Sequence, residues 1–358
     1  MFLYLQPIYL TQLGASAVQV GGILGLAGAA MALAHIPAGA IADHVGRKTV
    51  MGASWAMGLV AAVMMFLARS LPAFVLALVL YSMTAFVISP MTSYVTAARG
   101  PWSVGRALTT ISATYNAGAI IGPVFGGLLA AAAGLRNVYG LAASLFVVST
   151  ILMYMLHHQP VEPPGDGSRY RALLKNHAFG RLLVVVLISS TAMYLSWPLT
   201  PIFLEQVRHV TVAQVGALGS ANALGVVILN LTLGRTHPRL GFFLSQALVW
   251  CSVVFLWQGT AWVWYAAGYF LAGGYRTARS LMSAMIEGVI PRPQLGLAFG
   301  VAETIAGISL VVAPAVAGVL YNTRPDAPYL AALVLVPAAL AGSAILAPRV
   351  ESSAAARA

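Results

Sequence analysis

Long hydrophobic segments alternate with short polar breaks along the whole chain. They run at about 2–13, 18–42, 50–68, 73–96, 106–132, 138–156, 182–206, 212–233, 242–257, 261–286, 295–321 and 329–346. A helix needs about 20 apolar residues to cross a bilayer, whereas the strands of a membrane barrel are shorter and alternate in polarity. The pattern therefore predicts an all-α polytopic membrane protein. The first segment is too short to span a bilayer by itself.

One longer polar stretch, from His157 to Arg181, divides these segments into two groups of six, and its Pro and Gly residues are typical of a linker. We expect an N-terminal six-helix bundle over 1–156, with its first helix incomplete, and a cytoplasmic linker over 157–181. A C-terminal six-helix bundle over 182–347 and a cytoplasmic tail over 348–358 follow.

The two halves repeat each other in sequence. The segment 7–12 (PIYLTQ) matches 201–206 (PIFLEQ), and 18–21 (VQVG) is echoed by 213–216 (AQVG). Further matches keep a constant offset between 89–129 and 280–320. Two parallel repeats are typical of secondary transporters. Comparison of the two repeats also shows that far fewer residues precede Pro7 than precede the matching Pro201 in its segment. We therefore expect the first helix to be truncated at its start, either because the start codon is misplaced or because half of that span is lacking.

Composition and charge support a membrane protein. The chain is 60% hydrophobic and 8% charged, whereas soluble domains carry roughly 25% charged residues. The net charge of +11 is scattered between apolar segments, which argues against a nucleic-acid surface. Placing the 39–48 loop in the cytoplasm leaves few cations on the other side: Arg69, Arg136, Arg208 and Arg324. This predicts a multi-pass protein of the cell (inner) membrane with both termini in the cytoplasm.

A glycine-bounded loop carries an acid followed by two cations between the second and third segments. Its residues are Gly39, Asp43, Gly46, Arg47 and Lys48. The loop resembles the signature loop of the major facilitator superfamily of secondary transporters. The resemblance implies two six-helix bundles around a central cavity, with this loop as a cytoplasmic gate. The alternative is a loop that only sets topology.

The fifth long segment contains a proline among glycines: Gly118, Gly122, Pro123, Gly126 and Gly127. Such a helix can bend and pack closely. The pattern resembles the later part of a motif found in the drug and metabolite efflux (antiporter) branch of that superfamily, although Thr109 stands where an earlier glycine is expected. The resemblance implies export, and a tightly packed helix pair is the alternative.

Three charges are expected inside the spans of the second half. Counting from the turn near Pro291 places Glu303 at a depth similar to that of Arg279 and Arg276. An unpaired charge in a membrane is costly, so we expect ion pairing. The surplus cation is able to receive an anionic group. Glu303 can carry a coupled proton if conformational change separates it from arginine; a purely structural ion pair is the alternative.

The resemblance also implies a substrate cavity lined by polar and aromatic residues. The candidates are His35, Tyr81, Tyr115, Asn116, Tyr194, Trp197, Asn222 and Tyr275. His35 titrates in a suitable range, but a lone histidine in a span is also able to serve packing alone. The helix-4 arginine motif linked with proton coupling in many members is absent, which weighs against proton coupling.

These observations predict a monomeric secondary transporter that exports small amphipathic molecules by alternating access, as a proton-coupled antiporter of the multidrug kind. A transporter of a small organic anion or sugar that uses Arg276 and Arg279 is one alternative. A non-transporting scaffold or sensor is another. We expect no catalytic residue, cofactor, metal site or nucleic-acid partner, because no phosphate-binding loop or ligand cluster is present in the sequence.

Overall fold

The computed structural model describes residues 1–159, 176–290 and 295–346. Every regular element within these ranges is a helix, and ten candidate spans are long and apolar enough to cross a membrane. The predicted all-α membrane fold is therefore confirmed. The side chains of 35–44, 89, 104–105 and 295–297 also lie outside the description. Most of the predicted linker and the whole predicted tail fall on residues that are not described, so the predicted domain boundaries stay a prediction.

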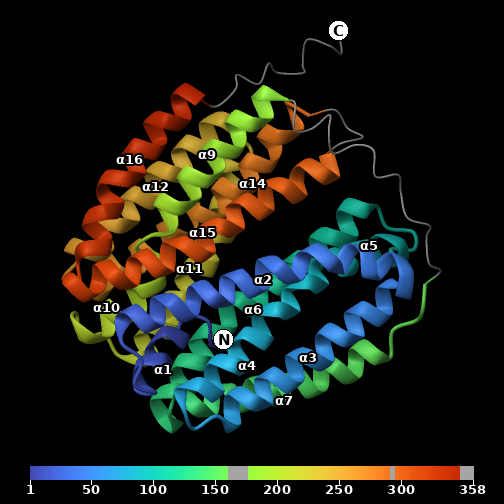
Figure 1. Ribbon diagram of the computed structural model, residues 1–358, viewed down its shortest axis with the longest axis horizontal. Helices are drawn as coiled ribbons and strands as arrows, with labels where there is room; N and C mark the ends of the chain where they lie inside the picture. Colours follow the sequence, from blue (N-terminus) through green and yellow to red (C-terminus); the bar gives the residue numbers. More distant parts are fainter. Residues whose placement is uncertain (160–175, 291–294, 347–358) are drawn as a thin grey trace. The chain divides into compact units, whose positions relative to one another are not determined.

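The chain forms two compact units. Unit 1 comprises 1–165 and 201–220, so the first unit also takes in a piece of the second sequence repeat. In it, α3 and α7 run side by side (Figure 1). Its elements are α1 (Gln6–Gln12), α2 (Ala17–Val45), α3 (Arg47–Leu67), α4 (Leu71–Met83), η1 (Thr84–Val87), α5 (Ile88–Ala98), α6 (Val104–Ala133), α7 (Leu135–Tyr154), most of α10 (Thr200–Gln206) and the start of α11 (Val212–Leu233).

Unit 2 comprises 166–200 and 221–358. Helix α12 packs against α13, α14 and α16, and α9 packs against α15 and α16 (Figure 1). Besides the rest of α11, its elements are α9 (His177–Tyr194), η3 (Trp197–Leu199), α12 (Pro238–Gln258), α13 (Trp262–Ala272), α14 (Gly274–Glu287), α15 (Leu295–Thr323) and α16 (Ala327–Leu346).

The sequence repeat is also a repeat of local structure. At the start of α2, the Ser16 amide donates to Gln19 Oε1 at 2.9 Å and the Gln19 amide donates to Ser16 Oγ at 3.3 Å. At the start of α11, Thr211 and Gln214 make the same two bonds at 2.9 and 3.3 Å. This reciprocal arrangement is a capping box, which satisfies amides that the first helical turn leaves without partners. Both repeats therefore start their second helix by the same means.

The fourth, seventh and tenth hydrophobic segments, each predicted as one helix, are interrupted near their middles. The breaks lie at η1, at 195–199 and at Gly273. At each break one backbone N–H donates three residues back instead of four: Ile88 to Ala85, Thr200 to Trp197 and Gly273 to Phe270. The carbonyl four residues back thereby loses its helical partner.

A side chain satisfies each of these three carbonyls. Ser54 Oγ donates to the Thr84 carbonyl at 2.9 Å, and Thr200 Oγ1 donates to the Ser196 carbonyl at 2.9 Å. Asn222 Nδ2 donates to the Tyr269 carbonyl at 2.8 Å. Breaks in apolar spans are tolerated only where freed backbone groups find such partners. Because of its break, the segment 261–286 forms α13 and α14 rather than one continuous span.

Helix α11 crosses the third break at very close range. A Cβ added to Gly225 would overlap the Phe270 carbonyl, and one added to Gly273 would lie 2.7 Å from the Gly225 carbonyl carbon. Small residues allow such backbone contact between membrane helices. The contact places Asn222 of α11 within reach of the Tyr269 carbonyl. The two glycines therefore position the side chain that saturates the break.

The packed interiors of the two units differ in character. In unit 1, the ring of Tyr139 on α7 lies within 5.2 Å of the rings of Phe2, Tyr9 and Phe74, measured between centroids. In unit 2, an apolar core formed by α9, α12, α14, α15 and α16 is accompanied by hydroxyl pairs, with 3.0 Å between Ser189 and Ser343. Hydrogen bonds of this kind hold membrane helices together where lipid supplies no hydrophobic drive.

Candidate functional site

Of the predicted cytoplasmic gate, the structure describes Gly46, Arg47 and Lys48 in full. Gly46 has a φ of 88° and stands immediately before α3, a backbone conformation that glycine adopts without steric penalty. Arg47 and Lys48 are half-buried in the first turn of α3. Gly39 and Asp43 belong to α2, but their side chains lie outside the described residues. The role of this loop stays a prediction.

The glycines around Pro123 on α6 have three different kinds of surroundings: open space, the first residue of the chain, and helix α11. A Cβ on Gly118 would meet nothing within 4 Å, whereas one on Gly122 would lie 3.4 Å from the Met1 nitrogen, and Gly126 contacts the Met1 side chain. A Cβ on Gly127 would lie 2.9 Å from Gly216 Cα on α11. The motif thus brings α6 against α11 and against the first residue, a close-packing role that the sequence also allowed.

Arg279 and Glu303 form an ion pair between α14 and α15 in unit 2. The Glu303 side chain is 53% exposed and that of Arg279 is 25% exposed, so water reaches the carboxylate more easily than the guanidinium. Arg276, one turn earlier on α14, is exposed. The opposite face of α14 is buried in the unit 2 core through Ala278, Leu281 and Met285. Helix α14 therefore packs by one face and presents charges on the other.

Aromatic side chains lie beside this ion pair. The rings of Tyr194 on α9 and Tyr275 on α14 are 5.2 Å apart, and Tyr275 lies one turn before Arg279 on α14. At the break before α10, the Trp197 ring is 4.9 Å from that of Tyr269. The structure thus brings Tyr194, Tyr275, Arg279 and Glu303 into one neighbourhood within unit 2.

The remaining cavity candidates are distributed more widely. In unit 1, Tyr81 contacts the rings of Phe2 and Phe146, and Tyr115 is exposed. Asn116 bonds to the Ser112 carbonyl at 2.9 Å on its own helix. Asn222 is buried and saturates the Tyr269 carbonyl, which gives it a structural role. The side chain of His35 lies outside the described residues, and the assignment of all these residues to a substrate cavity stays a prediction.

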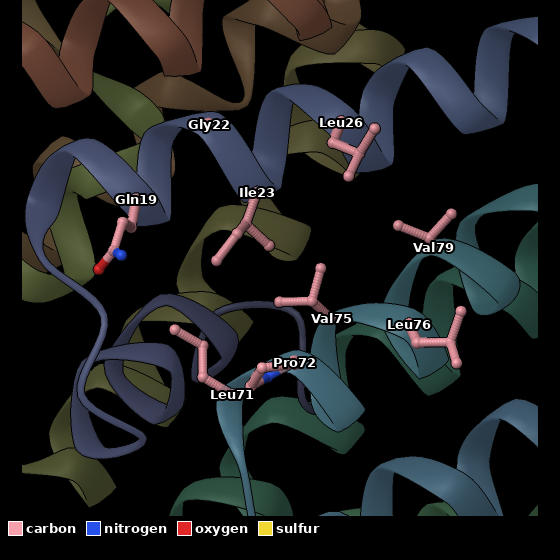
Figure 2. A pocket seen from close by; sticks show the side chains of 9 residues that line it. All are labelled: Gln19, Gly22, Ile23, Leu26, Leu71, Pro72, Val75, Leu76 and Val79. Atoms are coloured by element: carbon pink, nitrogen blue, oxygen red, sulfur yellow. The ribbon is translucent and has the colours of Figure 1, made fainter.

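A groove and a pocket among the described residues of unit 1 have contrasting chemistry. One is a groove of about 630 Å³ between α2 and α4, in which Ile23 and Val75 point toward each other (Figure 2). Its lining is apolar apart from Gln19: Gln19, Gly22, Ile23, Leu26, Leu71, Pro72, Val75, Leu76 and Val79. Such a lining offers little to fix the orientation of a polar compound.

The other hollow is polar and has a volume of about 440 Å³. It lies at the end of α1 and α10 and is lined by Thr11, Gln12, Glu205, Gln206 and His209. The sequence prediction of functional residues missed this set. The signal was available, because four of the five residues close the two copies of the repeated 7–12 and 201–206 segment.

Comparison with known proteins places the chain among membrane transporters. The family profile described as "Major Facilitator Superfamily" matches residues 1–188 and 182–357. A "Multi-drug resistance efflux pump PmrA homolog" of Lactococcus lactis is 24% identical over 87% of this chain and 81% of its own length. An "Enterobactin exporter EntS" of Shigella flexneri is 25% identical over 84% of this chain and 76% of its own.

Solved structures show the same fold at low identity. The nucleoside transporter NupG superposes with a TM-score of 0.78 and 14% identity over 97% of this chain and 93% of its own. At that identity the likeness speaks for the fold alone. The family profile and the efflux relatives confirm the resemblance predicted from the sequence.

Proposed function

Because the chain belongs to the Major Facilitator Superfamily, we propose that it is a secondary active transporter that exports small amphipathic molecules in exchange for protons. The observation that carries the proposal is the ion pair between Arg279 on α14 and Glu303 on α15. Glu303 lies within 298–323, a segment long and apolar enough to cross a membrane, and a charge inside such a segment is costly, which favours a functional role.

In this proposal the Glu303 carboxylate carries the coupled proton. Protonation of the Glu303 carboxylate removes its negative charge and with it the attraction to Arg279. The partly exposed carboxylate is accessible to a proton donor, while Arg279 keeps its charge at any working pH. Proton uptake therefore changes the charge of this surface by one and releases the arginine. In an antiporter, that change is coupled to the movement of substrate in the opposite direction.

The relatives support export as the direction. One bears the name of a multi-drug efflux pump and another that of an enterobactin exporter. An aromatic pair, Tyr194 and Tyr275, beside the charges suits amphipathic compounds, since rings supply apolar surface and charges fix orientation. We further propose alternating access in a cell membrane with both termini in the cytoplasm, in line with the positions of the cations.

Transport by the purified chain in lipid vesicles tests the proposal. We expect an imposed pH gradient to drive accumulation of an amphipathic dye, and Glu303→Gln to abolish this accumulation while dye exchange without a gradient persists. Asp326→Asn is the matched control, because this carboxylate pairs with Arg324 at the start of α16, away from the pair. Gradient-driven uptake that persists in Glu303→Gln removes the assignment of Glu303. Absence of transport for every compound favours the scaffold or sensor alternative.

A second candidate function is transport of a small organic anion or sugar. The observation that favours it is the exposure of Arg276, which gives the cluster two cations beside one carboxylate. Under this alternative, Arg276→Gln weakens transport of carboxylate-bearing compounds and leaves neutral compounds unaffected. Equal effects on both classes would exclude Arg276 as the receiving charge.

A further inference from the structure

The polar pocket of unit 1 forms where the two copies of one repeated segment end together. Thr11 and Gln12 close the first copy on α1, and Glu205 and Gln206 close the second on α10. The matching glutamines both line the pocket, so each repeat contributes an amide. At the position before each glutamine the copies differ: the first has the hydroxyl of Thr11 and the second has the carboxylate of Glu205. The pocket is therefore built from equivalent positions but carries its charge on one side.

The fifth lining residue, His209, has an unusual backbone. It has a φ of 54° and is the one non-glycine residue with positive φ in the part of the chain that the structure describes. Gly14, after α1, has a φ of 92°, but counting from the matched Gln12 and Gln206 places it one residue earlier than His209. In both copies the amide that follows the positive-φ residue donates to the carbonyl of the matching leucine, across five residues from Ala15 to Leu10 and across six from Val210 to Leu204. This is how a left-handed residue closes a helix end.

The comparison of the two turns singles out the imidazole of His209. Glycine adopts the left-handed conformation without steric penalty, whereas any residue with a Cβ is strained there. The first copy uses glycine for this conformation, and the second uses histidine in a turn that is one residue longer, with its side chain at the pocket. A strained residue at a polar hollow is an observation from which function can be inferred. The backbone conformation of this turn favours glycine, so we attribute the histidine at this position to the role of its imidazole in the pocket.

The chemistry of the lining selects the ligand. Glu205 supplies a half-buried negative charge. The Thr11 hydroxyl donates to the Ile8 carbonyl at 2.7 Å, so its oxygen faces other groups as an acceptor. The exposed side chains of Gln12, Gln206 and His209 each carry an acceptor that rotation of the side chain can turn toward a ligand. Arg208 is not part of the lining, and its guanidinium lies over the Phe203 ring, 5.4 Å from its centroid.

A ligand for this lining needs a positive charge and several N–H donors. A protonated primary amine has both, with three donors on one nitrogen. A quaternary ammonium has the charge without donors and is recognised by the ring faces of Trp, Tyr or Phe, none of which is among the five lining residues. The volume of about 440 Å³ falls at the lower end of the range of small-molecule sites.

We propose that this pocket binds a small protonated primary amine, with the Glu205 carboxylate pairing with the ammonium group and Thr11, Gln12, Gln206 and His209 accepting its hydrogens. The site is separate from the pair of Arg279 and Glu303. If both termini are cytoplasmic, it opens at the outer end of α1, where an exported amine leaves the protein. That last role rests on the proposed function, whereas binding does not.

Calorimetric titration of the full chain in detergent at neutral pH tests the binding site. The probe is 1,4-diaminobutane, and its control is the hexamethylated bis-quaternary analogue, which has the same charge and spacing but no N–H donor. We expect the diamine to bind at least about tenfold more tightly than the analogue, because hydrogen bonds to a charged acceptor are strong. Equal affinities, or no binding of the diamine, overturn the proposal.

Variants assign the site. Glu205→Gln is expected to weaken diamine binding at least about tenfold, while Asp326→Asn, the same change at another carboxylate, leaves it unchanged. His209→Gly is expected to weaken binding severalfold without lowering the melting temperature, because glycine suits this turn. If Glu205→Gln fails to fold, Thr11→Val replaces it and removes one acceptor. Unchanged binding in the folded variants overturns the proposal.

The outcome is distinguishable from that of the proposed function. Glu303→Gln is expected to retain diamine binding even where it abolishes gradient-driven transport. Diamine binding in a protein that transports nothing leaves this inference standing and removes the proposed function. Gradient-driven dye transport by a protein that binds no diamine leaves the proposed function standing and removes this inference.

Discussion

The close crossing of α11 and α13 in unit 2 allows a sharp test of the structure through Gly225→Ala. The added methyl would overlap the Phe270 carbonyl and lie 2.7 and 2.9 Å from two further backbone atoms of that residue. Backbone atoms cannot rotate away, so α11 and α13 must separate. Forcing a methyl into a packed contact costs about 1–3 kcal/mol. Separation also stretches the 2.8 Å bond from Asn222 to the Tyr269 carbonyl.

A matched glycine supplies the control. A Cβ on Gly342, also in a helix of unit 2, would meet nothing within 4 Å. Alanine is favoured over glycine inside a helix by roughly 1 kcal/mol, so Gly342→Ala is expected to leave stability unchanged or raise it. The same preference offsets part of the clash in Gly225→Ala. We therefore expect a net loss of about 1–2 kcal/mol, a fall of several degrees in melting temperature.

The chain carries its own reporter for this assay. Its single cysteine, Cys251, is half-buried on α12 in unit 2. A dye that fluoresces on reaction with a thiol therefore reports the unfolding of unit 2 during heating in detergent. If Gly225→Ala melts at or above the temperature of Gly342→Ala, the close crossing of α11 and α13 is wrong.

Three further predictions concern contacts that position the helices. Asn222→Ala leaves the Tyr269 carbonyl without its side-chain partner and is expected to lower the free energy of unfolding by about 1–3 kcal/mol in the thiol assay, whereas Asn116→Ala, at a more exposed site, has a smaller effect. Gly216→Ala brings a methyl against the Pro123 carbonyl and Gly127, so melting followed by circular dichroism should occur at a lower temperature than in Gly118→Ala; equal melting would contradict the contact of α6 with α11. Gln19→Ala breaks one capping box and is expected to speed hydrogen exchange of the Ser16 amide, while the Thr211 amide in the other repeat keeps its protection.

Hydrophobic length located the helices, but it did not locate their breaks. The segment predicted at 295–321 became α15 (Leu295–Thr323), a difference of two residues at one end. The break at Gly273 depends on a contact with Gly225, almost fifty residues away in sequence, and apolar periodicity carries no information on such contacts. The break at Thr84–Val87 contains neither proline nor glycine. It is supported by a hydroxyl from Ser54 on another helix.

The candidate sites were predictable to different degrees for a similar reason. Counting residues from one turn placed Arg279 opposite Glu303, because two antiparallel helices joined by a short turn keep equal depth, and the two side chains form an ion pair. The polar pocket requires the ends of α1 and α10 to meet, which a count along one helix cannot show. The difference between Gly14 and His209 was visible in sequence, but its meaning depends on the backbone angle.

The side-chain bonds at the three helix breaks have a mechanical consequence. An unbroken helix transmits a tilt from one end to the other, because each hydrogen bond ties a residue to the next turn. At 84–87, 195–199 and 273 that tie is replaced by a bond from a hydroxyl or an amide side chain, so these positions can act as joints. Bending at these positions therefore leaves no backbone carbonyl without a hydrogen bond, whereas bending elsewhere in a helix breaks one.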